Sequence, residues 1–431
     1  MRDGTGLRGC GAGLASLLLL GSGCVTVATH HGAIEPILPD ARYDALFPYY
    51  LELCAVTQIR SNFAPHGGTP GHAAMYVKGA CRDSASEFPT LKVCDDPVDL
   101  TDPESGFGVS VNKMLSNVNW VATPGKRLFY HGDLDSGEVL NVDSGIAAIY
   151  AAEAAGVFQG VDVHESYLPE SEDDEDALIY LAAAETLGTD FALDFGRTSY
   201  CARLPLGRAQ LGDVLEYLND LNRDYARGGR NYSWSGYNDN CSHTLHNSLA
   251  AAGVWKPKSI ATFRLGQLAN LSVPANEFID LAVLMTSFPI DDLDAILEDP
   301  VLRKTLARRS WLPTQHGALL QVIPIHEPNE LYETDAAIFM LTNPFRKGKT
   351  ESVAAMLDDP HWVDLEANLL HFQQLYGRVL GEQPSEAELL VGKPADRRAR
   401  RHYYNYIAAQ LADVNRKLEH LEALGPAPGA R

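Results

Sequence analysis

The sequence predicts an α+β fold, in which a sheet-forming N-terminal region is followed by a mostly helical C-terminal region. Up to about residue 262, short apolar or alternating segments separated by glycine and proline indicate strands. Beyond that point strand patterns become rare, and apolar residues recur with the period of a helix. The 431 residues are enough for two or three domains, each with its own core.

The first predicted elements lie in residues 43–62, where the pattern indicates a helix that leads into a strand. The segment 72–77 follows a glycine-rich turn and is expected to be a strand. Segments 107–115 and 118–125 alternate well enough to be two more strands, and 126–132 is a candidate for a further strand.

A second group of elements follows. The alanine-rich segment 143–161 is expected to be helical, and 198–206 is expected to be a strand. Residues 207–226 form an amphipathic helical pattern. Its apolar face consists of Leu211, Val214, Leu215 and Leu218. In the C-terminal region, residues 291–309, 363–381 and 396–424 have helical periods.

The N-terminal residues 1–24 have the layout of a signal peptide: two arginines, an apolar run and small residues before Cys24. The apolar run is too short to span a bilayer as a mature helix. The sequence "LGSGC" resembles a lipobox, which implies lipidation of Cys24 and a membrane anchor; the alternative is a simple secretory signal cleaved near Gly23. Either way, we expect export to the periplasmic side of the cell envelope. The predicted division is therefore signal 1–24, a first domain 25–262 and a helical region 263–431.

The composition narrows the class of protein. Apolar residues make up 45% of the chain and charged residues 21%, as in an ordinary globular protein. The formal net charge of −21 would repel phosphate backbones, so nucleic acid is not an expected partner.

Export changes the interpretation of the seven cysteines, because disulfides form outside the cytoplasm. The five that follow the signal segment are Cys54, Cys81, Cys94, Cys201 and Cys241. If Cys241 stays free, the other four can form two disulfides. A bond between Cys81 and Cys94 would close a short loop, and Cys54 would then pair with Cys201. Four cysteines allow three pairings, so the other two stay open.

The stretch "YNDNCSHTLHNSLAAAGVW" places Cys241 at the first turn of a predicted helix. The backbone at a helix N-terminus favours the thiolate form of a cysteine and supplies N–H donors for an oxyanion. A cysteine nucleophile also needs a base. His243 and His246 lie on the same helix, too close in sequence to reach the thiol well. The alternative is that Cys241 is a buried structural residue or is bonded in a disulfide.

His72 is the predicted base, because it begins a strand behind the turn "HGGTPG" and could face an open cleft. A third group should orient the base. Asn112 is the candidate, since it alternates to the same strand face as Ser110; Asn119 and His131 are the other choices. For Asn112, an amide satisfied by the backbone is an equally good interpretation.

The segments "GHAAMYVKG" and, much later, "NCSHTLHNSL" resemble those of circularly permuted papain-like enzymes. These include permuted relatives of the NlpC cell-wall peptidases and the lecithin:retinol acyltransferase group. The chain is also similar to a family of exported bacterial proteins of unknown function, akin to the N-terminal periplasmic domain of lacto-N-biosidase. The resemblance covers roughly residues 43–254.

This resemblance implies a permuted papain-like antiparallel sheet with a nucleophile helix, Cys241 as nucleophile and His72 as base. The implied activity is thiol-dependent hydrolysis or acyl transfer at an amide or ester of envelope peptides or lipids, with no cofactor. Two alternatives stay open. One is a catalytically inert, lipid-anchored scaffold. The other is a zinc site formed by Cys241, His243 and His246 with a further ligand such as His72 or Asp239, although the spacing matches no common zinc motif.

Overall fold

The chain is described by a computed structural model. The described residues are 25–27, 41–56, 72–95, 105–167, 198–228, 231–235, 239–258, 273–324, 326–330, 338–340, 347–389, 391 and 394–425. The predicted signal segment with Cys24, and the predicted boundary at residues 262 and 263, lie outside these ranges.

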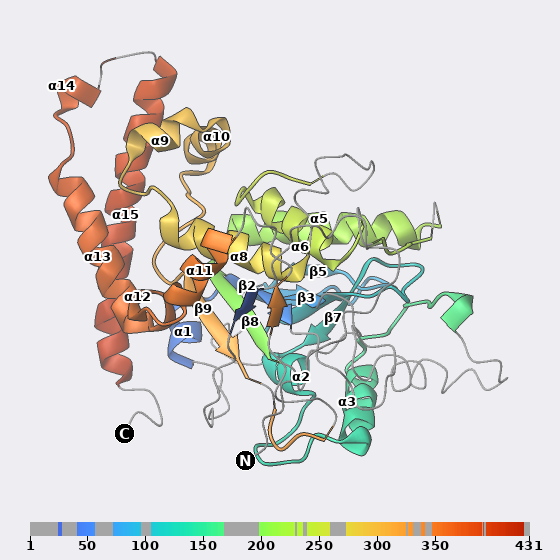
Figure 1. Cartoon of the computed structure of the whole chain (residues 1–431). Helices are drawn as coiled ribbons and strands as arrows, with labels where there is room; N and C mark the ends of the chain where they lie inside the picture. Colours follow the sequence, from blue (N-terminus) through green and yellow to red (C-terminus); the bar gives the residue numbers. More distant parts are fainter. Residues whose placement is uncertain are drawn as a thin grey trace.

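Within the described residues the fold is built on a six-stranded antiparallel sheet in the order β7–β6–β3–β2–β8–β9 (Figure 1). Its strands are β2 (Tyr50–Val56), β3 (His72–Lys78), β6 (Phe107–Val111), β7 (Trp120–Pro124), β8 (Ser199–Pro205) and β9 (Leu319–Ile323). Two smaller antiparallel pairs join β4 (Ala80–Arg82) to β5 (Leu91–Val93) and β1 (Val25–Val27) to β10 (Ile338–Met340). The prediction of a mixed α and β fold with an antiparallel sheet and C-terminal helices is confirmed.

One predicted strand is wrong. Residues 126–132 form α2 (Lys126–His131), which ends at Gly132 in the left-handed conformation. A short apolar run such as this one does not distinguish a buried strand from a buried helix by its period. The helix packs closely on β6, where a Cβ at Gly108 would lie 1.9 Å from the ring of Phe129.

Three helices cover one side of the sheet: α5 (Arg208–Ala226), α6 (Cys241–Ala252) and α8 (Pro274–Ser287) (Figure 1). The hydroxyl of Ser248 on α6 lies 3.9 Å from Sδ of Met75 on β3, which fixes the side that Met75 faces. We call this side, with Met75 and its register partner Leu53, the α6 face. The apolar stripe predicted for α5 is buried, as expected.

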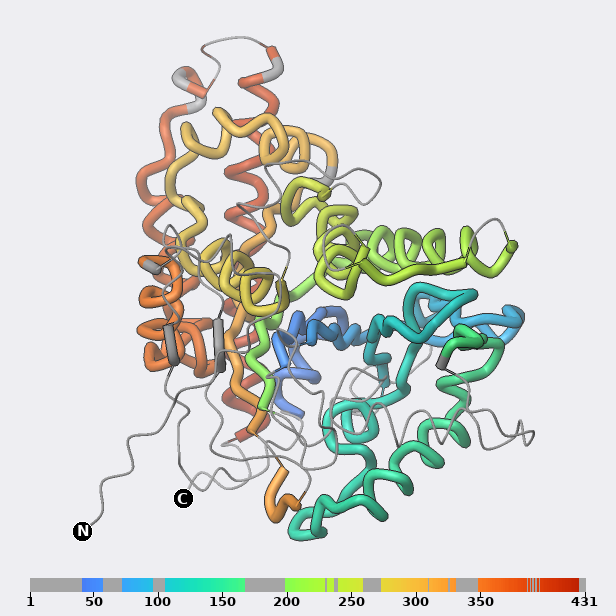
Figure 2. The backbone as a smooth tube through the Cα atoms, turned by 45° about the vertical axis from the view of Figure 1, so that its right-hand side comes forward, coloured from blue at the N-terminus to red at the C-terminus, as the bar shows by residue number. Residues whose placement is uncertain are grey.

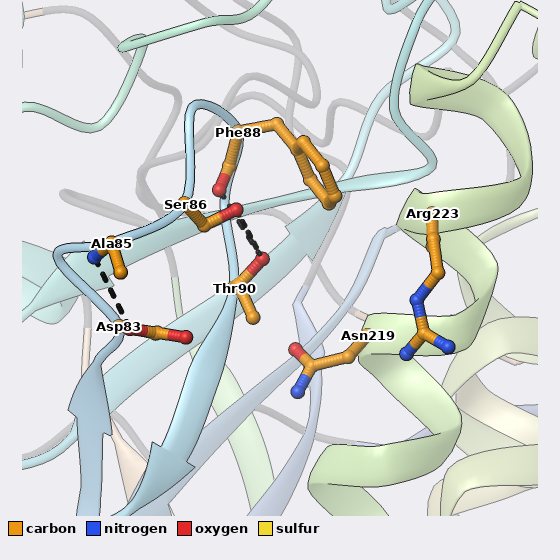
Figure 3. Close-up of a pocket in the computed structure, with 7 residues that line it drawn as sticks. All are labelled: Asp83, Ala85, Ser86, Phe88, Thr90, Asn219 and Arg223. Carbon is orange, nitrogen blue, oxygen red and sulfur yellow. Dashed lines mark hydrogen bonds between the residues drawn. The ribbon is translucent and has the colours of Figure 1, made fainter.

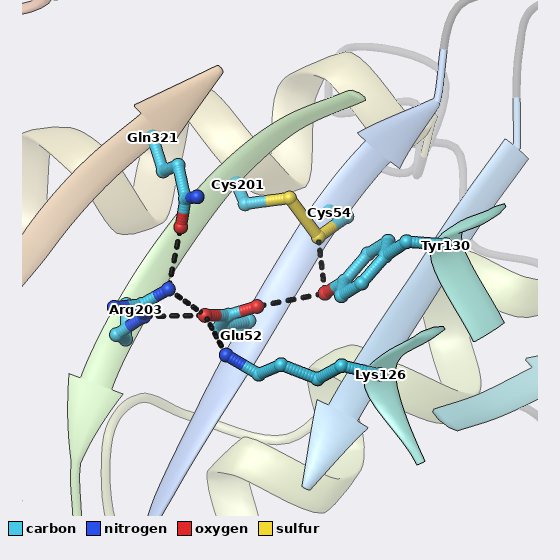
Figure 4. Close-up of a disulfide and its surroundings, with 7 residues drawn as sticks. All are labelled: Glu52, Cys54, Lys126, Tyr130, Cys201, Arg203 and Gln321. Carbon is cyan, nitrogen blue, oxygen red and sulfur yellow. Dashed lines mark hydrogen bonds and ion pairs between the residues drawn. A yellow bond between two sulfur atoms is a disulfide. The ribbon is translucent and has the colours of Figure 1, made fainter. Parts of the chain in front are cut away.

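The opposite side, which we call the Glu52 face, buries a cluster of charged residues beside the Cys54–Cys201 disulfide (Figure 4). Glu52 on β2 pairs with Arg203 on β8 and with Lys126 on α2, whose Nζ lies 3.2 Å from Oε1. The hydroxyl of Tyr130 donates to the other carboxylate oxygen at 2.8 Å. Burial alone would raise the pKa of Glu52, but these partners outweigh it and hold the pKa at about 2.

The short helix α1 (Ala41–Leu46) leads into β2, as predicted for the start of the domain. After α2 the chain forms α3 (Val142–Ala154), which contacts α2, and the 3-10 turn η1 (Glu165–Tyr167). A capping box at Asn141 and Ser144 begins α3, so the alanine-rich helix starts where its first N–H groups find acceptors.

The C-terminal region is mostly helical, as expected. Besides α8, its described helices are α9 (Leu293–Glu298), α10 (Pro300–Arg309), α11 (Lys347–Met356), α12 (Pro360–Val363), α13 (Leu365–Gly381), α14 (Glu386–Leu389) and α15 (Pro394–Leu424). The long helices α13 and α15 stand side by side to one side of the sheet (Figures 1 and 2). No helix among the described residues has the length and apolar character that a membrane span requires.

The C-terminal region also supplies a strand that its sequence did not reveal. β9 pairs antiparallel with β8 along Ser199–Arg203 and forms one edge of the sheet. The sheet therefore combines strands from both predicted regions of the chain.

Candidate active site around Cys241

Cys241 is the first residue of α6, as the sequence predicted. Asn240 is the N-cap, with an extended backbone and a side-chain oxygen that accepts from the backbone N–H of His243 at 3.2 Å. Because the cap occupies the third N–H, the N–H groups of the first two helical residues remain without an intrahelical acceptor. The thiol therefore lies at a helix end that carries partial positive charge.

Cys241 is the free cysteine of the described residues, and its side chain is buried with 7% of its surface exposed. The other four described cysteines are paired. Cys54 bonds to Cys201 across β2 and β8, and Cys81 bonds to Cys94 beside the β4–β5 pair. Of the three pairings that the sequence allowed, the structure contains the one that closes the short loop between Cys81 and Cys94.

Two buried hydroxyl groups belong to the surroundings of the thiol: those of Tyr232 and of Ser242, which directly follows Cys241. Tyr232 is fully buried, and its hydroxyl has no hydrogen-bond partner within the described part of the chain. Burial, followed by the charges of Asp239 and Cys241, raises the pKa of Tyr232 well above its usual value of 10, so the hydroxyl keeps its proton. Ser242 is also fully buried, and its hydroxyl likewise has no described partner.

A polar network holds the loop that precedes Cys241. Asp239 accepts from the hydroxyl of Tyr225 on α5 at 3.0 Å and from the side-chain amide of Asn119 at 3.5 Å. Asn119 in turn accepts from the hydroxyl of Thr244 on α6 at 2.8 Å. A β-bridge between Ser235 and Asp239 closes the loop. The approach to α6 is thus fixed to α5 and to the start of β7.

His72 does not lie beside Cys241. Side chains alternate between the two faces along a strand, and β3 pairs with β2 without interruption from Val56↔His72 onward. Since Met75 faces α6, His72 points to the Glu52 face. There its Nε2 lies 2.7 Å from the hydroxyl of Ser110, and both side chains are buried. The structure therefore does not form the Cys241–His72 pair that the sequence suggested.

Asn112 does not orient His72 either, because Ser110 makes that contact. The side-chain oxygen of Asn112 accepts from the backbone N–H of Met114 at 2.8 Å, which is the backbone-satisfied alternative. The third choice, His131, ends α2, and burial lowers its pKa to about 4, with His326 and Arg127 adding to the effect. Asn119 is the candidate orienting residue that does contact α6.

The two histidines on α6 face partners other than the thiol. Nδ1 of His243 lies 3.1 Å from the side-chain oxygen of Asn240, and burial lowers its pKa to about 4, so the ring is neutral at neutral pH. His246 contacts Glu277 through Nδ1 at 2.7 Å and the carbonyl oxygen of Lys256 through Nε2 at 2.9 Å. With these nitrogens engaged elsewhere, no group of three residues that could hold a metal ion is found among the described residues.

Comparison with protein-family models gave no match to this chain, and comparison with curated proteins and with solved structures gave none either. The site is therefore interpreted from its own geometry.

Sequence reasoning missed Tyr232 and Ser242. The available signal was position: a tyrosine stands in the loop before "NC", and a serine directly follows the cysteine. Neither pattern shows that both hydroxyls become buried without a partner, because burial is decided by α5 and the sheet packing around them.

Proposed function

We propose that this chain is an exported thiol hydrolase or acyltransferase that forms an acyl intermediate on Cys241. The observation that carries the proposal is the state of the cysteines. Four described cysteines are oxidised in pairs, whereas Cys241 keeps its thiol at the first position of a capped helix. A free thiol at a helix N-terminus in an otherwise disulfide-bonded chain is typical of a reactive cysteine.

The reaction follows from this position. The Cys241 sulfur attacks the carbonyl carbon of an amide or ester, and the leaving amine or alcohol departs with a proton. Water or a second nucleophile then attacks the thioester, which restores the thiol and gives hydrolysis or transfer. The oxyanion formed in both steps needs hydrogen-bond donors. The hydroxyls of Tyr232 and Ser242 and the first N–H groups of α6 are available for that role.

The base is the open part of the proposal. His72 stays a prediction, since it lies on the Glu52 face with Ser110. The proposal depends on Cys241 and its oxyanion donors, and the experiment below tests His72 separately.

The wider proposal takes in the fold family, the anchor and the substrate. A permuted papain-like arrangement is supported by the antiparallel sheet with α6 packed on one face. Cys24 is proposed as the lipid-bearing residue, which would hold the protein on the periplasmic side of a membrane. We propose envelope peptides or lipids as substrates, with no cofactor and no nucleic-acid partner.

A second candidate is an inert, lipid-anchored scaffold. It is favoured by the burial of Cys241, which is 7% exposed, and by the contacts that His72, His243 and His246 make with groups other than the thiol. A cysteine in such surroundings can serve as a small apolar core residue.

The test is site-resolved labelling with iodoacetamide from about pH 5 to 9, read by mass spectrometry on the unreduced protein. Wild type is compared with Cys241→Ser, His72→Ala and Tyr232→Phe. The four disulfide-bonded cysteines serve as internal controls that should not label. We expect Cys241 to react at pH 7 faster than N-acetylcysteine in the same tube.

The variants separate the roles. Slow labelling in His72→Ala alone would identify His72 as the base, whereas unchanged labelling would assign that role to another group. Tyr232→Phe should label normally yet lose turnover of a p-nitrophenyl ester, because an oxyanion donor acts on the substrate oxygen. A wild-type rate no faster than N-acetylcysteine would remove the enzyme proposal and leave the scaffold.

A further inference from the structure

A pocket of about 260 Å³ lies between the loop that joins β4 to β5 and helix α5 (Figure 3). Its walls include Asp83, Ser86, Phe88 and Thr90 from the loop and Asn219 and Arg223 from α5. None of these residues belongs to the site around Cys241. Ligand pockets usually measure about 300–1,000 Å³, so this smaller pocket has room only for a molecule with few atoms.

The pocket is built on a fixed frame. The Cys81–Cys94 disulfide closes the base of the β4–β5 pair. Asn219 holds the backbone of Leu91 in both directions, accepting from its N–H at 3.0 Å and donating to its carbonyl at 2.7 Å. The hydroxyl of Thr90 donates to that of Ser86 at 2.9 Å. The lining groups are therefore positioned before any ligand arrives, which lowers the entropic cost of binding.

The pocket carries one charge of each sign. No ion pair joins Asp83 to Arg223 in the described structure; Arg223 pairs instead with Asp220 on its own helix, at 2.5 Å. One carboxylate oxygen of Asp83 accepts from the backbone N–H of Ala85 at 3.2 Å. The guanidinium has five donors, so the contact with Asp220 leaves several of them for a ligand.

We propose that this pocket binds a free α-amino acid as its zwitterion. Asp83 would accept from the ammonium group, Arg223 would donate to the carboxylate, and the ring of Phe88 would contact an apolar side chain. A simple anion would meet Asp83, and a simple cation would meet Arg223. A molecule with both charges on one carbon satisfies both walls within a small volume.

The test is isothermal titration calorimetry of the full chain with L-leucine, L-leucinamide and N-acetyl-L-leucine. Leucinamide lacks the carboxylate, and N-acetyl-leucine lacks the ammonium group. We expect leucine to bind and each blocked compound to bind about tenfold more weakly or worse, because each loses a charge-assisted hydrogen bond. Equal affinities for the three probes, or no heat with leucine, would overturn the proposal.

Variants then assign each charge. Arg223→Gln should weaken the binding of leucine and abolish the preference for leucine over leucinamide. Asp83→Asn should abolish the preference for leucine over N-acetyl-leucine. The matched control is Arg227→Gln, an exposed arginine at the C-cap of α5, four residues after Arg223. If Arg227→Gln has the same effect as Arg223→Gln, the attraction is non-specific and the pocket is not the site.

The unfolding midpoint of each variant shows whether it has folded. Arg223 is partly exposed, so its variant keeps the test decisive even if Asp83→Asn disturbs the loop. Cys241→Ser should bind leucine like wild type, because no part of this pocket uses the thiol. Leucine binding and thiol reactivity can therefore fail independently.

Discussion

The two faces of the central sheet differ in the polar groups that they bury beside their apolar cores. On the α6 face, β3 and β2 present Ala73, Met75 and Leu53 to the helices, and these side chains are buried with no charge among them. On the Glu52 face, the middle of the same two strands buries a carboxylate between Arg203 and Lys126 (Figure 4). Both faces remove apolar area from water, on the Glu52 face with Tyr50, Tyr76 and Phe129, and the Glu52 face adds buried charges that satisfy one another.

The difference bears on where chemistry can occur. A buried charge cluster is stable only when its members are paired, so its groups are already committed. On the α6 side, the paired groups His246 and Glu277 are likewise committed, whereas Tyr232 and Ser242 near the N-terminus of α6 keep hydroxyls without described partners. Uncommitted donors beside a thiol are what an incoming substrate oxygen requires.

The largest expected effect comes from breaking the Glu52 face. Glu52→Ala leaves Arg203 and Lys126 buried without their carboxylate, and we expect a loss of about 3–5 kcal/mol in the free energy of unfolding. Urea unfolding followed by circular dichroism measures it. Asp135→Asn, which removes an exposed ion pair with Arg127, is the control and should change little. A loss below about 1 kcal/mol for Glu52→Ala would mean that the cluster contributes little to stability.

A smaller effect concerns the α6 side and its dependence on pH. The pKa of His243 is about 4 in the folded protein and 6.5 for an unperturbed histidine. As pH falls from about 6.5 to 4, the unfolded chain takes up the proton first, so stability is lost across that window. Melting temperatures of His243→Gln should therefore fall less steeply than those of wild type between these values.

His131 gives a comparison for the pH dependence attributed to His243. Its pKa is also lowered to about 4, but it lies on α2. His131→Gln should flatten the same window independently, and the double variant should be flatter than either single one. If His243→Gln leaves the slope unchanged, the histidine on α6 is not buried as its neutral form.

The smallest expected effect concerns the N-cap of α6, the helix that begins at Cys241. Asn240→Ala removes the N-cap of α6 and should cost about 1 kcal/mol in unfolding free energy, whereas Asn240→Asp should retain most of it. Asn141→Ala at the start of α3 gives a matched cap loss away from the thiol. If only Asn240→Ala slows iodoacetamide labelling of Cys241, the cap also positions the thiol; equal labelling in both variants would limit it to stability.

Local patterns in the sequence were sufficient to predict many helices and strands. The helix that begins at Cys241, the buried stripe of α5 from Leu211 to Leu218 and the strand β8 are all found as predicted. Each depends on a cap or a period that lies within a few residues. The odd number of cysteines after the signal segment indicated that one would stay unpaired, but that this one is Cys241 was a condition of the sequence argument and is shown by the structure.

The direction of His72 did not follow from the sequence. β3 is buried on both faces, so its residues Ala73, Ala74 and Met75 show no alternation that would reveal which side meets α6. A shift of one residue in register reverses every side chain of a strand, and the pairing of β3 with β2 and β6 fixes that register. The partner of His72, Ser110, depends on the same register.

β9 was hidden for a related reason, because its five residues lie among helices and pair with a strand more than a hundred positions earlier. That pairing decides where the chain can be truncated. A fragment that ends at residue 262 would lose β9 and leave the buried strand β8 with an unpaired row of N–H and C=O groups. Such an edge recruits other chains. We expect that fragment to aggregate on expression, so the C-terminal helices should be retained even when only the thiol is under study.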